Sequence, residues 1–228
     1  MSPTDHGGSA RDAFINGLGF ALDRFQVDAI GSVDAGRSVL VSAPTGSGKT
    51  IVADFAVARA VGAGKKAFYT TPLKALSNQK FGELSARYGA ASVGLLTGDI
   101  SHHPDAPIVV MTTEVLRNML FARSPALRGL GLVVLDEVHY LQDPYRGSVW
   151  EEVIILTPPE VTLVALSATV SNAEVFGAWL REVRGPTDVV VENRRPVTLF
   201  NHIAVAERLT KITSGGVRTR TSSHTEPR

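Results

Sequence analysis

Short apolar runs alternate along the chain with stretches whose apolar residues recur at helical spacing. Between the runs, side chains such as Ile51, Phe55 and Ala58 fall three or four positions apart, which is typical of one helix face. The alternation predicts repeated strand–helix units, and so an α/β fold of mostly parallel sheet with helices on both faces. The runs are rich in Val, Ile and Leu, as strands buried on both faces are: Ser38–Ser42, Ala67–Thr70, Ile108–Met111, Leu132–Leu135 and Val161–Leu166.

A second pattern concerns the polar residues that follow these runs. Almost every run ends in a polar cluster, such as Pro-Thr-Gly-Ser-Gly-Lys-Thr, Thr-Pro-Leu-Lys, Thr-Thr-Glu, Asp-Glu-Val-His or Ser-Ala-Thr. The carboxyl ends of parallel strands share one edge of a sheet, and open α/β sheets bind ligands there. We therefore expect these clusters to meet at one edge.

The segment 43–50 has the sequence of a phosphate-binding loop between a strand and a helix. Gly46 and Gly48 permit backbone conformations that turn amides toward an anion, and the new helix adds its free N–H groups. Lys49 can reach the β- and γ-phosphates, and the Thr50 hydroxyl can bind Mg²⁺. The loop residues expected to bind the nucleotide are Pro44, Thr45, Gly46, Ser47, Gly48, Lys49 and Thr50. An ordinary Gly-Ser turn is the alternative, and Ala43 stands where the usual motif has Gly.

Two adjacent carboxylates, Asp136 and Glu137, follow the run Leu132–Leu135. Such a pair at the end of an apolar strand is costly unless a cation or solvent meets it. In a phosphoryl-transfer site, Asp136 would hold Mg²⁺, mostly through water, and Glu137 would orient and deprotonate the attacking water. A solvated turn is the alternative for the pair, and a satisfied polar residue on a helix is the alternative for a coupling role of His139.

These residues resemble the superfamily 2 DExH-box helicases over roughly residues 18–203, and the segment 136–139 matches the box that names the group. The resemblance implies a RecA-like P-loop NTPase that uses ATP and Mg²⁺, with Gln26 reading adenine. Thr70–Gln79 is similar to motif Ia, and Ser167-Ala168-Thr169 to motif III, in which Ser167 and Thr169 couple hydrolysis to movement. The segments 146–152, 167–172 and 195–197 are similar to the superkiller/exosome-associated branch, which includes the actinobacterial HelY-like RNA helicases.

The resemblance also implies which residues contact a nucleic-acid strand. Hydroxyls and free amides at helix starts hold phosphate oxygens without reading bases, and Thr71, Thr97 and Thr113 are expected at or near strand-to-helix turns. Taken singly, such a Thr is equally consistent with ordinary helix capping. The full set expected to contact nucleic acid is Thr71, Pro72, Lys74, Thr97, Gly98, Thr113 and Glu114.

Composition narrows the class of protein. With 228 residues, 44% of them hydrophobic and 20% charged, the chain can bury a sizeable core and is not mainly disordered. No apolar run approaches the roughly 18 residues of a membrane span, so we expect no membrane partner. The start of the chain has no basic-then-apolar order of a secretory signal and the sequence has no cysteine, so a cytoplasmic location is expected. The net charge is +1, and a basic excess in 207–228 leaves the body slightly acidic. Nucleic-acid contacts in the body must therefore come from local positioning.

The expected domain organisation is a flexible N-terminus over 1–10, one ATP-binding domain over 11–206 and a disordered tail over 207–228. A second strand pair is expected at Val189–Val191 and Val197–Ile203. A helicase of this class has a second RecA-like domain with an arginine finger in a Gln-x-x-Gly-Arg-x-Gly-Arg pattern, which this sequence lacks. We therefore expect the first motor domain only, from a truncated gene, a frameshift or a fragment, with very slow hydrolysis by itself.

Three functions remain open from the sequence. The favoured one is the motor domain of an ATP-dependent helicase, with RNA preferred over DNA as the nucleic acid. A DNA-directed helicase domain and a non-catalytic module that binds nucleic acid or partners are the alternatives. A small-molecule kinase is more distant, since the sequence offers no evident acceptor site or lid.

Overall fold

The computed structural model describes residues 10–139, 147–169 and 172–195, together with the backbone of 202–205, 208–213 and 216–218. The chain divides into two compact units, Met1–Arg194 and Arg195–Arg228.

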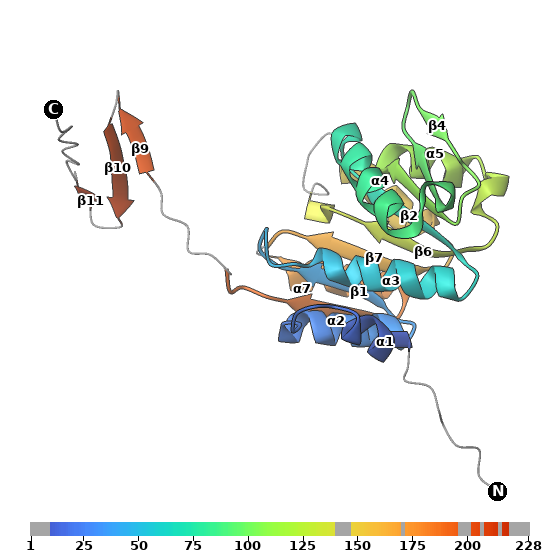
Figure 1. Ribbon diagram of the computed structural model, residues 1–228, viewed down its shortest axis with the longest axis horizontal. Coiled ribbons are helices and arrows are strands. Elements are labelled where there is room, and N and C mark those ends of the chain that lie inside the picture. The colour runs from blue at the N-terminus through green and yellow to red at the C-terminus, as the bar shows by residue number, and fades with distance from the viewer. Residues whose placement is uncertain are drawn as a thin grey trace, which may run out of the picture. The chain divides into compact units, whose positions relative to one another are not determined.

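The first unit is built on an eight-stranded sheet in the order β4-β3-β5-β2-β6-β7-β1-β8 (Figure 1). Every neighbouring pair is parallel except β3 and β4, which are antiparallel. The predicted α/β fold with a mostly parallel sheet is confirmed. The strands are β1 (Ser38–Ser42), β2 (Lys66–Thr71), β3 (Val93–Leu96), β4 (Ser101–His102), β5 (Ile108–Thr112), β6 (Leu130–Leu135), β7 (Thr162–Ser167) and β8 (Thr187–Val191).

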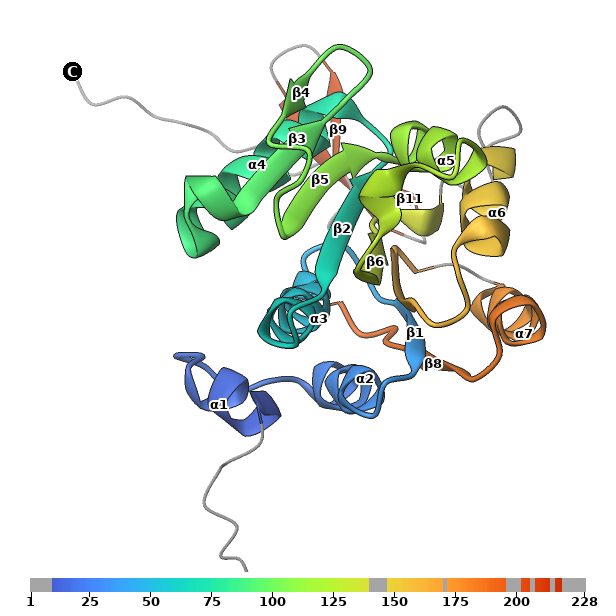
Figure 2. The same ribbon diagram turned by 90° about the vertical axis from the view of Figure 1, so that its right-hand side faces the viewer.

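Helices cover both faces of this sheet, as predicted, and Figure 2 shows the two layers. One face carries α1 (Ala10–Asn16), α2 (Arg24–Asp34), α3 (Thr50–Gly62) and α4 (Lys74–Tyr88), and the other carries α5 (Thr113–Phe121), α6 (Gly147–Leu156) and α7 (Ala173–Arg184). Two single turns, η1 (Ala90–Ser92) and η2 (Pro125–Leu127), precede β3 and β6.

The core follows the two-residue period of the strands. In β1, Val39 and Val41 pack toward α2 and α3, whereas Leu40 packs toward α6 and α7. Because both faces are covered, most successive residues of the central strands are apolar, which explains why these strands form apolar runs in the sequence. Among the described residues, the largest fully buried side chain is Trp150 of α6, which lies in the core between the sheet and α5, α6 and α7.

The apolar pattern of the sequence does not predict the hairpin that β3 and β4 form. Gly94 lies within β3, and a Cβ at that position would stand 2.1 Å from the carbonyl oxygen of His103. The close passage of the returning chain therefore requires a glycine in the strand, and that glycine interrupts the run of apolar side chains from which strands are predicted.

The expected strand at Val189–Val191 exists, but its pairing differs from the prediction. The strand extends over Thr187–Val191 as β8 and joins the main sheet parallel to β1, with Leu40 opposite Val189. Among the described residues, the pairing of β8 is with β1. The partner expected at Val197–Ile203 lies mostly outside the described residues.

The second unit contains a three-stranded antiparallel sheet in the order β11-β10-β9. Its strands are β9 (His202–Val205), β10 (Arg208–Thr213) and β11 (Gly216–Arg218). The structure therefore assigns strands within 207–228, where we expect a tail without regular structure, and it divides the chain at 194/195 instead of 206/207. Among the described residues, no helix combines the length and the apolar character needed to cross a lipid bilayer.

Candidate nucleotide and nucleic-acid site

The carboxyl ends of five parallel strands bring the predicted motifs to one edge of the sheet. Ser42, which precedes the phosphate loop, is opposite Ser167 in the pairing of β1 with β7. Thr70 is opposite Leu135 in the pairing of β2 with β6, so motif Ia starts beside the acidic pair. Thr71 is opposite Thr112 in the pairing of β2 with β5. The expected clustering of polar segments at one edge is confirmed.

The phosphate loop runs from the end of β1 into α3, which begins at Thr50. Gly46 and Gly48 have φ values of +82° and +80°, a region that favours glycine. Ala43 is buried and its amide donates to the carbonyl oxygen of Ser167 at 3.1 Å, so the departure from Gly at this place is accommodated. Lys49 is buried as the last residue before the helix.

Gln26 contacts the phosphate loop directly. Its Nε2 donates to the carbonyl oxygen of Gly48 at 3.0 Å and to that of Ser47 at 3.4 Å, and its Oε1 accepts from the amide of Asp23 at 2.9 Å. The side chain is only 5% exposed, and both its polar ends are engaged within the protein. Gln26 therefore holds the loop in this structure, and adenine recognition by this residue stays a prediction.

Asp136 and Glu137 stand at the carboxyl end of β6. The strand pairing continues one residue further, because the Asp136 amide donates to the Thr70 carbonyl oxygen at 3.0 Å. Glu137 has a φ of +57°, a conformation that is uncommon for a residue with a side chain and often marks a functional site. Its amide donates to Asp136 Oδ1 at 2.9 Å.

Sequence reasoning missed the partner of the other Asp136 oxygen. Tyr69, which is fully buried in β2, donates its hydroxyl to Asp136 Oδ2 at 2.8 Å. Burial, followed by the nearby Asp136 carboxylate, raises the pKa of Tyr69 well above its ordinary value. An apolar strand with one tyrosine is the signal available in the sequence, because a buried phenol needs a hydrogen-bond partner.

His139 joins the acidic pair to the Ser-Ala-Thr segment. Its Nδ1 lies 3.2 Å from Glu137 Oε2 and accepts from the Ala168 amide at 3.4 Å. One nitrogen cannot donate to Glu137 and accept from Ala168 at the same time, so the proton on Nδ1 decides which contact is strong. Ser167 is buried at the end of β7, and Thr169 is exposed two residues later.

A cavity of about 390 Å³ opens at this edge and is lined from both sides by the predicted site. Thr50 comes from the phosphate loop, Asp136 and Glu137 from the acidic pair, and Thr71 from motif Ia. Residues of α4 complete the lining, among them Lys80, which forms an ion pair with Glu83 at 2.5 Å. The hydrogen bond from Lys80 lowers the pKa of Glu83.

The residues present suit a magnesium nucleotide. Thr50 and Asp136 offer oxygen atoms, which Mg²⁺ prefers as ligands. Within the described part of the chain, Ser47 Oγ and Ser167 Oγ are buried without a hydrogen-bond partner, which is costly unless a ligand or water meets them. The oxygen donors of Thr50 and Asp136, together with the phosphate loop, fit a magnesium nucleotide.

The motif Ia threonine and the α5 threonine meet beside this cavity. Thr71 Oγ1 donates to the Leu73 carbonyl oxygen at 3.1 Å and lies 2.7 Å from Ser77 Oγ. Thr113 Oγ1 donates to the Thr71 carbonyl oxygen at 3.3 Å. Both hydroxyls are buried and used internally, so the predicted phosphate contacts would have to come from backbone amides at the starts of α4 and α5.

Thr97 occupies a different kind of turn from the one expected. It follows β3 and leads into β4, so it lies at a strand-to-strand turn and not at a strand-to-helix turn. Its Oγ1 donates to Asp99 Oδ1 at 2.8 Å, and Lys74 Nζ lies 2.9 Å from the same oxygen. The hydrogen bond from Lys74, followed by that from Thr97, lowers the pKa of Asp99.

The other residues expected to contact nucleic acid lie close to these two groups. A Cβ at Gly98 would stand 4.0 Å from Lys74 Cε, so this glycine is next to the Lys74 stem. Pro72 is buried after β2, and Glu114 is half-buried in the first turn of α5, where a carboxylate suits the positive end of the helix.

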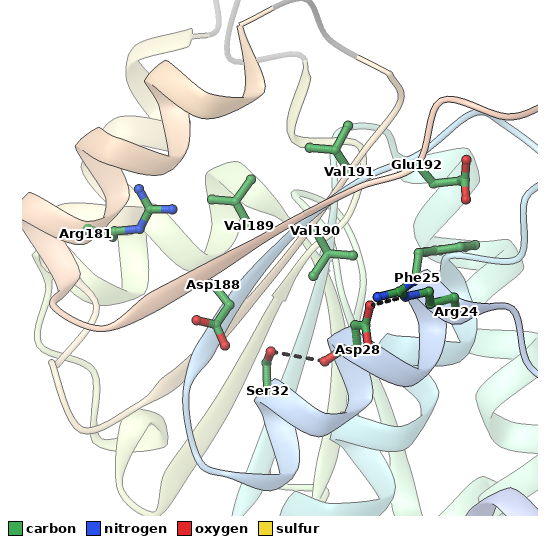
Figure 3. A pocket seen from close by; sticks show the side chains of 10 residues that line it. All are labelled: Arg24, Phe25, Asp28, Ser32, Arg181, Asp188, Val189, Val190, Val191 and Glu192. Carbon is green, nitrogen blue, oxygen red and sulfur yellow. Dashed lines mark hydrogen bonds and ion pairs between the residues drawn. The ribbon is translucent and has the colours of Figure 1, made fainter.

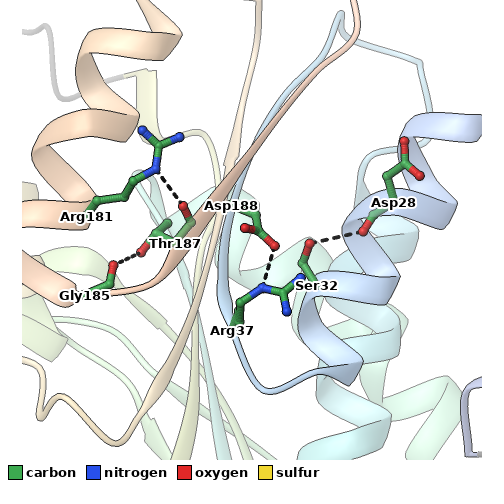
Figure 4. Close-up of polar contacts among 7 residues, drawn as sticks. All are labelled: Asp28, Ser32, Arg37, Arg181, Gly185, Thr187 and Asp188. Carbon is green, nitrogen blue, oxygen red and sulfur yellow. Dashed lines mark hydrogen bonds and ion pairs between the residues drawn. The ribbon is translucent and has the colours of Figure 1, made fainter.

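A separate hollow of about 570 Å³ runs along β8 between α2 and α7 (Figure 3). Phe25, the neighbour of Gln26, lies in its wall near Glu192, whereas Gln26 itself contacts the phosphate loop. At the other end, Arg37 Nε donates to Asp188 Oδ2 at 2.8 Å and Arg181 Nε donates to the Thr187 carbonyl oxygen at 3.0 Å (Figure 4). The first contact joins β8 to the residue before β1, and the second joins β8 to α7.

A parallel sheet with a phosphate loop after its β1 strand, and an acidic pair facing the same cavity, defines a P-loop nucleoside-triphosphatase domain of RecA-like fold. A family model described as DEAD/DEAH box helicase matches residues 23–176. The chain belongs to this family, which confirms the resemblance expected from the sequence.

The relatives narrow the branch. The chain is 60% identical over 198 residues to "Probable helicase HelY" of Mycobacterium tuberculosis, covering 87% of this chain and 22% of that protein. It is 52% identical over 194 residues to the chloroplastic DExH-box ATP-dependent RNA helicase DExH15 of Arabidopsis thaliana, covering 82% and 17%. It is 47% identical over 185 residues to the ATP-dependent RNA helicase mtr4 of Schizosaccharomyces pombe, covering 81% and 16%.

The chain thus spans about a fifth of the length of these curated relatives. Among solved structures, the DUF1998 helicase MrfA bound to DNA matches with a TM-score of 0.66 at 22% identity, over 82% of this chain and 30% of that one. A hypothetical ATP-dependent RNA helicase from Sulfolobus tokodaii matches with a TM-score of 0.63 at 19% identity, over 82% and 57%. At these identities the two structures support the fold alone.

Proposed function

We propose that this chain is the ATP-binding motor domain of an ATP-dependent nucleic-acid helicase, in which hydrolysis is coupled to strand movement. One observation carries the proposal: Thr50 of the phosphate loop and the pair Asp136 and Glu137 line the same cavity. Two sequence segments about ninety residues apart, each suited to one part of a magnesium nucleotide, therefore meet at one place.

In this proposal the loop amides and Lys49 bind the phosphates, and the Thr50 hydroxyl and Asp136 hold the metal ion. Mg²⁺, when bound with ATP, would neutralise charge on the phosphate oxygens. Asp136 would act through metal-bound water, because both its oxygens already accept hydrogen bonds from the protein. Glu137 orients and deprotonates the attacking water.

His139 is the proposed link between nucleotide and nucleic acid. It contacts Glu137 on one side and the Ala168 amide on the other. A change at Glu137 that moves the proton on His139 would weaken one contact and strengthen the other. Ser167 and Thr169 flank Ala168, so they would follow that change.

The proposed nucleic-acid partner is RNA. Contacts at the starts of α4 and α5 address the phosphate backbone and do not distinguish RNA from DNA. Relatives named as RNA helicases at 52% and 47% identity favour RNA. Competition between RNA and DNA strands of one sequence tests this choice, since RNA alone offers a 2′-hydroxyl. Equal competition would favour the DNA-directed alternative or a sugar-indifferent site.

We further propose that turnover requires a second RecA-like domain. An arginine finger supplied by such a domain is worth roughly 10³ to 10⁵ in rate. The isolated chain should therefore bind ATP with Mg²⁺, hydrolyse it very slowly and leave duplexes unopened. Robust nucleic-acid-stimulated ATPase activity of the pure monomer would contradict this. A cytoplasmic location also stays a prediction.

The decisive experiment for the nucleotide site is Lys49→Ala, with fluorescent ATP binding as the measurement. Loss of the buried ammonium should abolish binding or weaken it severely, because no other cation of the loop can replace it. Lys65→Ala is the matched control, since Lys65 is exposed before β2 at the opposite edge of the sheet. Unchanged affinity in Lys49→Ala would overturn the assignment of the phosphate loop.

A further inference from the structure

Tyr69 provides one of two hydrogen bonds that fix the Asp136 carboxylate. The Tyr69 hydroxyl donates to Oδ2 at 2.8 Å from the neighbouring strand β2, and the Glu137 amide donates to Oδ1 at 2.9 Å. With one donor on each oxygen, the carboxylate cannot rotate without breaking a hydrogen bond. The direction of its remaining lone pairs is therefore set by the protein.

The tyrosine ring is itself held in place. Tyr69 is fully buried in the core that contains α3 and α4. Lys80 Nζ lies 5.3 Å from the centre of the ring, and this lysine is paired with Glu83. The phenol thus has a packed ring and one directed hydroxyl, which is the arrangement of a side chain that orients another group.

We propose that Tyr69 is a positioning residue that sets the affinity of the nucleotide site for Mg²⁺ by holding the Asp136 carboxylate. This inference rests on the proposed function, because it requires Asp136 to hold the metal. A carboxylate that acts through metal-bound water must keep its direction to be effective. Partners that orient a metal-holding group typically change metal affinity about 10- to 100-fold when they are removed.

The test replaces Tyr69 by Phe, which deletes one oxygen atom and keeps the buried ring. Fluorescent ADP binding is titrated with Mg²⁺, and affinity is measured also without metal in the presence of a chelator. In Tyr69→Phe, the apparent Mg²⁺ affinity should fall about 10- to 100-fold, while metal-free ADP affinity stays unchanged. Tyr88→Phe, at the end of α4, is the control that loses a tyrosine hydroxyl away from the site.

A double-mutant cycle separates positioning from a general effect on the fold. In an Asp136→Asn background, Tyr69→Phe should cause no further loss of Mg²⁺ affinity, because the group that it orients is already changed. A Tyr69→Phe chain that melts earlier but titrates with Mg²⁺ like the unaltered chain would show that the hydroxyl serves stability alone. An equal fall in metal-free and metal-bound affinity would also overturn the inference.

These outcomes are distinct from failure of the proposed function. If the unaltered chain binds no ADP, or if Mg²⁺ does not strengthen binding, the nucleotide site itself is wrong. If the unaltered chain behaves as proposed and Tyr69→Phe matches it in every titration, only the role of Tyr69 is wrong.

Discussion

Two features of Gly48 disfavour any larger residue there, and a pair of substitutions can measure them separately. Its φ of +80° is unfavourable for any residue with a Cβ, and a Cβ there would stand 2.7 Å from Gln26 Nε2. Gly46 has nearly the same φ, +82°, but nothing lies within 4 Å of its Cβ position. The pair Gly48→Ala and Gly46→Ala therefore shares the backbone cost and differs in the contact with Gln26.

The magnitudes follow from these two terms. The left-handed conformation costs an alanine roughly 1 to 2 kcal/mol. Displacing the Gln26 amide from the carbonyl oxygens of Ser47 and Gly48 leaves buried polar groups unpaired, which costs about 1 to 3 kcal/mol more. Gly48→Ala should thus lower the free energy of unfolding by about 2 to 5 kcal/mol, and Gly46→Ala by only about 1 to 2.

Nucleotide-free urea denaturation of both variants, alone and in a Gln26→Ala background, measures this difference. Removing Gln26 removes the group that an added Cβ would strike. In that background Gly48→Ala should therefore cost only about as much as Gly46→Ala. Equal costs in the unaltered background, or a difference that persists without Gln26, would refute the role given to this side chain.

Two further predictions concern the strand β8. A hydrogen bond from Ser32, followed by the ion pair with Arg37, lowers the pKa of Asp188. A lowered carboxyl pKa stabilises the fold above the unfolded value of about 3.9, and this stabilisation is lost as pH falls through the folded value. The pair is partly exposed, so Asp188→Asn should cost at most about 1 kcal/mol at pH 7 and less at pH 3; an equal cost in urea denaturation at both pH values would contradict the linkage. Gly177→Ala should cost about 1 to 3 kcal/mol, because its Cβ would stand 2.2 Å from Val189 Cγ2. Gly82→Ala is the control, because a Cβ at this position of α4 meets open space, and it should stabilise the fold by up to about 1 kcal/mol. Thermal unfolding compares the two variants. Similar melting temperatures for Gly177→Ala and Gly82→Ala would argue against the close packing of α7 on β8.

The central strands could be predicted from the sequence because burial on both faces makes them continuous apolar runs. The phosphate loop and the acidic pair could be predicted because their chemistry depends on residue type and local spacing. The strand β3 could not be predicted, because Gly94 interrupts its apolar pattern. A glycine is required there by the chain that passes beside it. The pairing of β8 could not be predicted because its neighbour β1 lies far from it in the sequence, and local residue patterns do not specify such neighbours.

Side-chain partners were predictable only where a motif specifies them. The contact of Gln26 with Gly48 joins residues 22 positions apart, and that of Tyr69 with Asp136 joins residues 67 apart. Local spacing in the sequence does not specify contacts between residues so far apart along the chain. For Thr97, the motif predicts a contact with nucleic acid but does not predict the kind of turn. That turn joins β3 to β4 in a hairpin, which local spacing does not specify.

The central claim is that one edge of the sheet gathers triphosphate and divalent cation. A crystal structure of the chain with a non-hydrolysable ATP analogue and Mg²⁺ tests it most directly. We predict phosphates on the amides of residues 46–50 and Lys49, with the metal ion about 2.1 Å from Thr50 Oγ1 and facing Asp136 through water. A nucleotide bound in the hollow along β8, or a metal ion away from Asp136, would contradict the account.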